Sequence, residues 1–323
     1  MFRSGISLLV VFLTMACIAV KPFDAQAQIT TNVVDLDLTE VIQCNIPDEE
    51  PLKPLICNVL LECFVDQLNE AESFLDQVFT GYRNDMPAFL RNQLDEPVLI
   101  QVVMDSIDGK GMVLAQAGPR TVVNLLPNPF LRLRGGFRGW SIPRTGTMTF
   151  DIDDIPCLVL SDSIQDVCVH EAFHALGHPN LFEIAGLNDA SNVFGNVNFV
   201  GDVAGINGVG YGLTEFRQES GNPLATFIPL SLDDGSGHLS IFEPTFVRID
   251  EGFQEVFVPS ISGGGIQAFM SRSLQGMYAD LGFQIRGING PGFIDLDGDL
   301  IEDNPLVINP VFEVDCDASN NDP

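Results

Sequence analysis

The chain has 323 residues, of which 44 are acidic and 15 are basic, so its formal net charge is -29. This acidic excess argues against nucleic acid as a partner, because phosphate binding requires clustered Lys and Arg, and it argues equally against docking on anionic membranes. The hydrophobic fraction of 46% is enough for a sizeable core and excludes wholesale disorder, and the length allows about two domains.

The first 27 residues have the features of an export signal. Residues 8–20 are apolar but too few to span a bilayer, and residues 25–27 (AQA) have the small-x-small form of a cleavage site. We therefore expect residues 1–27 to be a signal peptide and the mature protein to be secreted, extracellular or periplasmic, without a membrane span. The alternative is a lipid anchor at Cys17.

Six cysteines follow the signal, and an even number in an exported chain suggests disulfides. They are Cys44, Cys57, Cys63, Cys157, Cys168 and Cys316. We expect neighbours in sequence to pair, which predicts a bond between Cys157 and Cys168 and another within the first three. The alternative is that some of the six are free buried thiols.

The N-terminal half of the mature chain alternates between helical and extended patterns. Residues 55–80 carry apolar side chains at helical spacing, which predicts one or two amphipathic helices. Residues 97–104 are rich in β-branched side chains and predict a strand, followed by a turn at 108–111. Further strands are predicted at 121–126 and 146–151.

The C-terminal half is less regular. A helix is predicted over residues 162–177, whereas residues 178–265 are rich in Gly and Asn and predict only scattered short elements. A second helix is predicted over 270–283, closed by Gly282, and a Gly/Pro/Asp-rich tail starts at residue 288. Together these elements indicate an α+β fold.

The helix predicted over 162–177 carries the most informative motif. Ser161 and Ser163 are candidate N-caps, and Ser163 with Asp166 has the spacing of a capping box. His170 and His174 are four residues apart and lie on one helix face, so two imidazoles can reach one metal ion.

Glu171, between the two histidines, is displaced enough not to bind the metal but can reach a water on it. Zinc binds neutral imidazole and, in catalytic sites, keeps one position for water. It lowers the pKa of that water, and a carboxylate then takes the proton as the water attacks a carbonyl. The motif therefore predicts metal-assisted hydrolysis.

A third metal ligand is needed to complete such a site. His178 is excluded by geometry, because eight residues of helix span about 12 Å and zinc–nitrogen bonds are only about 2 Å; we expect it to be a C-terminal cap or a surface residue. The remaining histidine is His238, in a Gly-rich loop. A carboxylate ligand stays open as the alternative, from Glu183, Glu215 or Glu219.

The segment 170–177 (HEAFHALG) resembles the HExxHxxG helix of the metzincin zinc peptidases. Most metzincins place the third ligand three residues after that Gly, where this chain has Asn180. The leishmanolysin-like branch instead has a third His well downstream, and His238 is 64 residues after His174. Four other segments resemble the bacterial secreted members of that branch, in the expected order: residues 108–119, 146–151, 211–220 and 270–283.

This resemblance covers roughly residues 65–285 and implies a two-lobed α+β metalloprotease with the active-site helix at the floor of the cleft. It implies that His170, His174 and His238 bind zinc and that Glu171 is the general base. The implied function is a secreted zinc endopeptidase that hydrolyses peptide bonds in protein or peptide substrates. The implied domains are 28–64, an N-terminal segment, 65–287, the catalytic domain, and 288–323, an acidic tail.

Two positions depart from the family pattern. Leu239 stands where a Trp usually follows the third His, and Phe257 stands where the methionine turn has its Met. Met270 is a candidate substitute, but it aligns better with the start of the last helix, and a Phe at 257 is expected to form a hydrophobic floor instead. These departures motivate the alternative of a catalytically weak or inactive extracellular binding protein.

The segments that flank the catalytic domain have their own candidate roles. Residues 28–64 are a candidate pro-segment, in which one of its three cysteines could cap the zinc of a latent form. The tail carries alternating carboxylates that resemble extracellular calcium loops of the DxDGDxxxD type. Its candidate calcium ligands are Asp295, Asp297, Asp299 and Asp303. It lacks the glycine and glutamate positions of an EF-hand, and its alternative is a solvated acidic linker.

Overall fold

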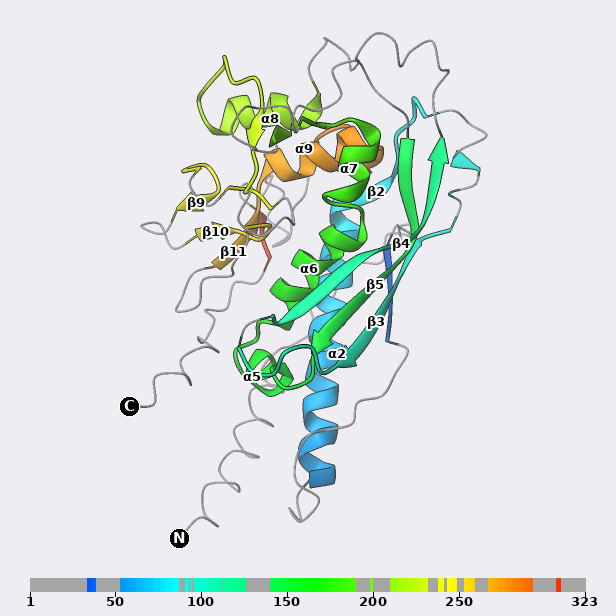
Figure 1. Ribbon diagram of the computed structural model, residues 1–323, viewed down its shortest axis with the longest axis vertical. Helices are drawn as coiled ribbons and strands as arrows, with labels where there is room; N and C mark the ends of the chain where they lie inside the picture. The colour runs from blue at the N-terminus through cyan, green and yellow to red at the C-terminus, as the bar shows by residue number, and fades with distance from the viewer. Residues whose placement is uncertain are drawn as a thin grey trace.

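The computed structural model describes residues 34–38, 53–86, 91–92, 94, 96–111, 113–125, 140–189, 198–199, 210–231, 238–240, 243–248, 253–258, 267–292 and 306–308. The expected signal peptide and the candidate calcium ligands lie outside these residues. The described chain is a mixed α/β structure, as expected. Helix α6 (Ile164–Ala175) lies between a four-stranded sheet on one side and α8, α9 and a smaller sheet on the other (Figure 1).

The four-stranded sheet has the order β1-β3-β5-β4. Its strands are β1 (Val34–Leu38), β3 (Val98–Asp105), β5 (Trp140–Asp151) and β4 (Ala115–Leu125). The first three are parallel, and β4 runs antiparallel to β5 at the edge. In β3, Val98, Ile100 and Val102 are fully buried, because alternate side chains of a strand point to the same face. The three predicted strands are therefore confirmed, with β4 and β5 extending further towards their N-terminal ends.

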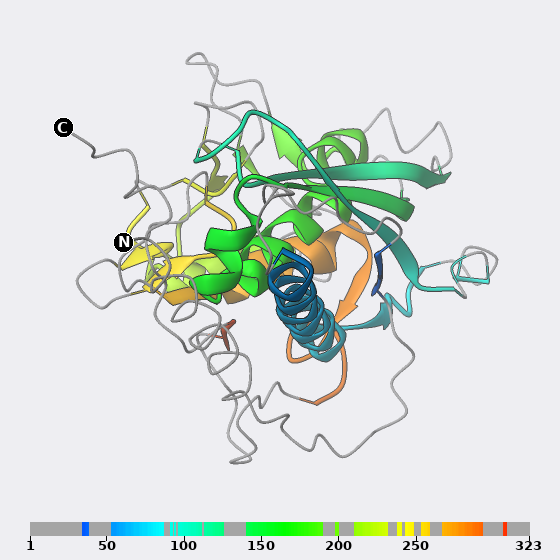
Figure 2. The same ribbon diagram turned by 90° about the horizontal axis from the view of Figure 1, so that it is seen from below.

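The predicted N-terminal helix is a single element, α2 (Lys53–Val78). It buries Phe64, Leu68, Phe74 and Leu75, which lie on one stripe, and it packs against α6 and α5 (Ile155–Leu160). Figure 2 shows α2 nearly end-on beside these helices. The boundary expected between residues 64 and 65 falls inside α2, and β1 pairs with β3, so residues on both sides of that boundary belong to one core.

The remaining elements are short. The helices are α7 (Asn180–Ala185), α8 (Tyr211–Glu219) and α9 (Arg272–Leu281). The strands β2 (Phe79–Tyr82) and β12 (Phe283–Ile285) form a pair, and β6 (Asn188–Asp189), β7 (Asn198–Phe199) and β8 (Ile228–Pro229) form a small sheet. A third sheet consists of β13 (Leu306–Val307), β11 (Gln267–Met270), β10 (Phe253–Glu255) and β9 (Val247–Arg248). Helix α9 confirms the predicted C-terminal helix, with Gly282 at its C-cap.

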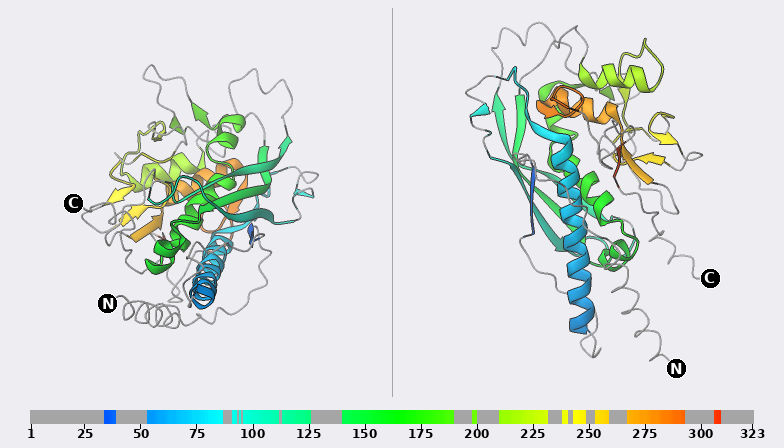
Figure 3. Two further views of the ribbon diagram at one scale, coloured as in Figure 1. Left: turned by 60° about the horizontal axis from the view of Figure 1, so that its bottom comes forward. Right: turned by 180° about the vertical axis from the view of Figure 1, so that it is seen from behind.

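Helices α8 and α9 are antiparallel neighbours that cap each other (Figure 3). Asp280, near the end of α9, accepts hydrogen bonds from the first two amides of α8 at 2.8 and 3.1 Å. Glu219, the last residue of α8, accepts from the first two amides of α9 at 2.8 and 2.9 Å. Each carboxylate therefore satisfies amides that have no partner within their own helix and complements the positive end of its dipole.

Gly276→Ala is expected to destabilise the protein, although Ala is normally the better helix former. A Cβ on Gly276 would lie 2.7 Å from the Cα and N of Gly212 across the α8–α9 contact, and backbone atoms cannot move aside locally. We expect a loss of about 1–3 kcal/mol in the free energy of unfolding, measured by thermal or denaturant unfolding. Gly118→Ala is the control, because a Cβ there meets nothing within 4 Å; equal stability of Gly276→Ala and wild type would contradict the close contact.

The cysteine prediction is corrected in one respect. Cys168 is a free thiol, fully buried in α6, so the expected bond between Cys157 and Cys168 is wrong. Cys63 and Cys157 are each engaged in a disulfide bond. The alternative prediction, a free buried thiol, is therefore confirmed for Cys168. Separately, none of the helices in the described part of the chain is long and apolar enough to cross a bilayer.

Candidate metal centre

Helix α6, which carries the histidine motif, starts differently from the prediction. Ser163 is the N-cap residue, but its side chain makes no capping hydrogen bond, so the predicted capping box is wrong. Its hydroxyl is instead 2.8 Å from that of Ser161. The amide of Ile164 donates to Oε1 of Gln67, on α2, at 3.0 Å. The side chain of Gln67, on another helix, therefore accepts the hydrogen bond that was expected to go to a local capping residue.

The end of α6 is held by a Schellman motif. Gly177 has φ of +123°, a conformation that favours glycine. Its amide donates to the carbonyl of His174 at 3.0 Å, and the amide of His178 donates to that of Phe173 at 3.2 Å, which is the hydrogen-bond pattern of this motif. The helix therefore ends at Ala175, one residue after His174, and the chain turns back at Gly177.

All twelve residues of α6 are buried, because the helix packs on the sheet, on α2 and on other elements. Close packing on the sheet is possible at Gly146 of β5, where a Cβ would lie 2.9 Å from that of Ala175. The two histidines of α6 are thereby fixed in the interior. His170 and His174 are each 8% exposed, so their rings are close to solvent without lying in it.

The structure brings His170, His174 and His238 together, as the sequence predicted. Nε2 of His238 lies 3.0 Å from Nε2 of His170 and 2.9 Å from Nε2 of His174. Among the described residues these three form the only group whose ligand atoms could hold a metal ion. Zinc–nitrogen bonds of about 2.0–2.1 Å in a tetrahedron place ligand nitrogens about 3.3 Å apart, close to the observed spacing.

The second nitrogen of each α6 histidine fixes its tautomer. Nδ1 of His170 donates to the carbonyl of Val256 at 2.6 Å, and Nδ1 of His174 donates to the carbonyl of His178 at 3.2 Å. Because a carbonyl only accepts, each Nδ1 carries the proton and each Nε2 presents a lone pair. Nε2 of His238 can donate to only one of them. Three converging nitrogens with too few protons are suited to a cation, which is the fit expected of a metal site.

Phe257 forms the floor of this histidine cluster. Its ring is fully buried, and its centroid lies 5.3 Å from that of His170, 4.9 Å from His174 and 5.1 Å from His238. It also contacts the ring of His178 at 4.8 Å. The expected hydrophobic floor is therefore present, and the residue that contacts the histidine rings is Phe257 itself.

Glu171 lies in the same buried turn of α6. It is 6% exposed, and its Oε2 has no hydrogen-bond partner among the described residues. Burial raises the pKa of Glu171 to about 8, because the ionised form is poorly solvated there. A buried carboxyl with an unused acceptor oxygen beside the three histidines is suited to exchange a proton with a neighbouring water.

His178 takes part in the C-terminal cap of α6 through its amide, as one of the two alternatives from the sequence had it, but it is not a surface residue. It is 1% exposed, and its ring packs on Phe182 with centroids 4.7 Å apart. Its contribution to the cluster is its backbone carbonyl, which accepts from Nδ1 of His174. The sequence gives no signal for such a role, because any residue at that position supplies a carbonyl.

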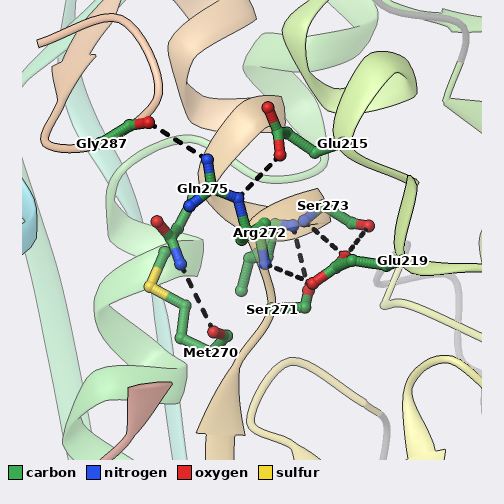
Figure 4. Close-up of polar contacts among 9 residues, drawn as sticks. Glu215, Glu219, Met270, Ser271, Arg272, Ser273, Gln275 and Gly287 are labelled. Carbon is green, nitrogen blue, oxygen red and sulfur yellow. Dashed lines mark hydrogen bonds and ion pairs between the residues drawn. The ribbon is translucent and has the colours of Figure 1, made fainter. Parts of the chain in front are cut away.

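The three candidate carboxylate ligands lie elsewhere. Glu215 pairs with the guanidinium of Arg272 at 2.8 Å, and Glu219 caps α9 and accepts from the hydroxyl of Ser273 (Figure 4). Glu183 is exposed on α7. The structure therefore brings His238, and none of these glutamates, to the two histidines of α6.

A second buried carboxyl, Glu255, lies one residue before the Val256 carbonyl that holds His170. Its Oε2 accepts from the amide of Ser271 at 2.6 Å, and its Oε1 has no partner among the described residues. The pKa of Glu255 is raised to about 8, mainly by burial; hydrogen bonds from Ser271 and from the backbone of Phe257 lower it, and the neighbouring charge of Glu219 raises it. This residue was not predicted from the sequence.

Glu255 gives the stability of the metal-free protein a pH dependence of known sign. Its pKa is raised on folding, so the unfolded chain loses this proton above its ordinary pKa of 4.5 while the folded chain keeps it to about 8. The free energy of unfolding is therefore expected to fall as the pH rises from about 5 to 8. Glu255→Gln should flatten that fall, measured as Tm against pH; parallel Tm curves for the variant and wild type would contradict the assignment.

No model of a known protein family matches the chain, and no curated protein matches it either. The interpretation of the site therefore depends on its own residues and their geometry.

Proposed function

We propose that the protein is a secreted zinc-dependent endopeptidase that hydrolyses peptide bonds in protein or peptide substrates, with the two-lobed fold of the leishmanolysin-like metzincins. The observation that carries the proposal is the convergence of three histidine Nε2 atoms, with that of His238 within 3.0 Å of those of His170 and His174, beside the buried Glu171. Zinc is the metal proposed, because three imidazoles with one position left for water is a ligand set of catalytic zinc.

Each residue has a defined task in this proposal. His170, His174 and His238 would hold the zinc. When bound there, zinc would lower the pKa of a coordinated water towards neutrality and polarise the scissile carbonyl. Glu171 accepts the proton from the attacking water and afterwards delivers it to the leaving amine. The carbonyls of Val256 and His178 keep the two α6 imidazoles in the tautomer that presents Nε2.

The metal assignment is tested first by stoichiometry. Protein purified without chelators and dialysed against metal-free buffer is expected to retain about one zinc per chain, measured by elemental mass spectrometry. Purified protein that carries another metal in place of zinc, or no metal at all, would contradict the proposal.

A second candidate function is a metal-binding extracellular protein with weak or no catalysis. Phe257 and Leu239 favour it, because both depart from the family pattern beside the metal ligands. Its prediction differs in one respect: zinc binds with the same stoichiometry, but no protein substrate is cleaved. Activity therefore separates the two functions, whereas metal content does not.

The flanking segments complete the proposal. We infer export through residues 1–27 and calcium binding by the tail around Asp295 and Asp303, both of which lie outside the described residues. Calcium binding would appear as a rise in Tm on adding millimolar Ca²⁺ that is absent when Asp295, Asp297, Asp299 and Asp303 are replaced by Asn.

A further inference from the structure

The segment Glu255–Val258, here termed the support segment, contacts all three proposed ligands through its backbone and one ring. The carbonyl of Val256 accepts from Nδ1 of His170 at 2.6 Å. The carbonyl of Phe257 accepts from the amide of Leu239, next to His238, at 2.9 Å. The Phe257 ring lies under the histidine rings at centroid distances of 4.9–5.3 Å. A shift of this segment would therefore move the whole ligand set.

The support segment is anchored on the side away from the histidines. Its backbone is held by two neighbours: the amide of Val256 donates to the carbonyl of Phe269 at 2.8 Å, and that of Glu255 to Phe246 at 2.7 Å. The side chain of Glu255 adds a third tie, to the amide of Ser271 at the N-cap of α9, at 2.6 Å. This tie joins the support segment to the end of a helix that is itself fixed by α8.

Helix α9 is a firm anchor for this purpose. Glu219 of α8 accepts from its first two amides, and the hydroxyl of Ser271 accepts from the amide of Leu274 at 3.1 Å. The amide of Ser271 is thereby left for Glu255. Two glutamates from two different elements divide the amides at this helix terminus, so Glu255 couples the support segment to the α8–α9 pair.

Burial makes this arrangement costly if Glu255 has no further role. The side chain is 0% exposed, and a buried carboxyl with an unmatched oxygen is unfavourable compared with an apolar residue. Glu255 directly precedes Val256 and Phe257, whose backbone and ring contact the proposed ligands. Glu255 therefore lies where a displacement of less than 1 Å would change the geometry of the proposed metal site.

We propose that Glu255 is a positioning residue for the metal centre: by bonding the N-cap amide of α9 it sets the place of the Val256 carbonyl and the Phe257 ring, and through them the orientation of His170, His174 and His238. The inference rests on the metal site of the proposed function. Glu255 itself contacts neither the metal nor the substrate in this proposal.

The test compares Glu255→Ala, Glu255→Gln and Asp280→Ala with wild type. Asp280→Ala is the matched control, because Asp280 is also a fully buried carboxylate that accepts backbone amides at a helix N-terminus, but at the far end of the α8–α9 pair. Zn²⁺ affinity is measured by competition with a chromophoric chelator, the ligand field is measured from the absorption spectrum of the Co²⁺ protein, and Tm is measured without metal.

We expect both alanine variants to lower Tm, and only Glu255→Ala to weaken Zn²⁺ binding, by about 10- to 100-fold, with a shifted Co²⁺ spectrum. Glu255→Gln keeps an acceptor for the Ser271 amide and is expected to stay within about threefold of wild type in Zn²⁺ affinity. If Glu255→Ala does not fold, Glu255→Asp replaces it: one methylene shorter, it should alter both the affinity and the spectrum.

Three results would overturn the inference while leaving the proposed function in place. They are a wild-type affinity and spectrum in Glu255→Ala or Glu255→Asp, an equal loss of affinity in Asp280→Ala, and a failure of Glu255→Gln to preserve affinity. Absence of Zn²⁺ binding by wild-type protein is a distinguishable outcome, because it overturns the proposed function and the inference with it.

Discussion

Replacing Glu171 with alanine is expected to lower kcat for peptide-bond cleavage by about 10²- to 10⁴-fold, the typical contribution of a positioned general base. In the proposed site the imidazole ligands come from His170, His174 and His238, so the Zn²⁺ affinity should stay within about threefold of wild type. The fall should appear in kcat and kcat/KM together, because Glu171 acts in the transition state rather than in substrate binding. The measurement is steady-state cleavage of a fluorogenic peptide, with metal content determined on the same samples.

Glu183→Ala is the control for this variant. Glu183 is a glutamate on the neighbouring helix α7, but it is exposed and takes no part in the histidine cluster, so its removal should leave both cleavage and metal content unchanged. Retained cleavage by Glu171→Ala would remove the general base from the account. Loss of zinc from Glu171→Ala would mean that its carboxylate supports the metal instead of the proton transfer.

His238→Ala is expected to weaken Zn²⁺ binding by more than about 100-fold. Loss of a residue that only hydrogen-bonds to a ligand typically costs up to about 100-fold, and loss of a ligand itself should cost more. Two converging Nε2 atoms would remain, from His170 and His174, and two protein ligands make a poor zinc site. Cleavage should fall with the metal content. Chelator competition followed by elemental analysis of the dialysed variant measures the loss.

Glu219→Gln is the comparison variant for His238→Ala, because the sequence left Glu219 as an alternative third ligand. The structure assigns its carboxylate to the N-terminus of α9, at 2.8 and 2.9 Å from two backbone amides. The variant should therefore lose stability and keep zinc. Zinc retained by His238→Ala and lost by Glu219→Gln would reverse the assignment of the third ligand.

The elements that the sequence predicted best are those with a local physical signal. The 3.6-residue periodicity of residues 55–80 and the β-branched run of 97–104 led directly to α2 and β3. The His-Glu-x-x-His spacing placed both histidines on one face of α6, and Gly177 marked its end. In each case the signal is a pattern of residue types among neighbours in sequence.

The features that the sequence did not predict depend on distant contacts. Gln67 supplies the cap of α6 from another helix, and the capping box proposed from Ser163 does not form. His178 is buried because the chain folds back over Phe257. The carbonyl that orients His170 belongs to Val256, and no side-chain pattern marks a backbone acceptor. Such roles follow from the tertiary arrangement alone.

The approach of His238 to the α6 histidines is an intermediate case. Once His178 was excluded, His238 and three glutamates remained as candidates for the third ligand, and the family resemblance favoured His238. The deciding contacts are backbone bonds: the amide of Ser231 donates to the carbonyl of His238 at 2.6 Å, and the amide of Leu239 donates to that of Phe257. The second bond joins the loop to the support segment, so the proposed third ligand is held by the same segment that orients the first.

The most direct test of the central claim is cleavage of a denatured protein substrate by wild-type protein loaded with one equivalent of Zn²⁺, followed before and after chelation and again after zinc is returned. The account predicts cleavage that is lost on chelation and restored by about one equivalent of Zn²⁺. Stoichiometric zinc binding without any cleavage, or cleavage that persists in the fully chelated protein, would contradict it.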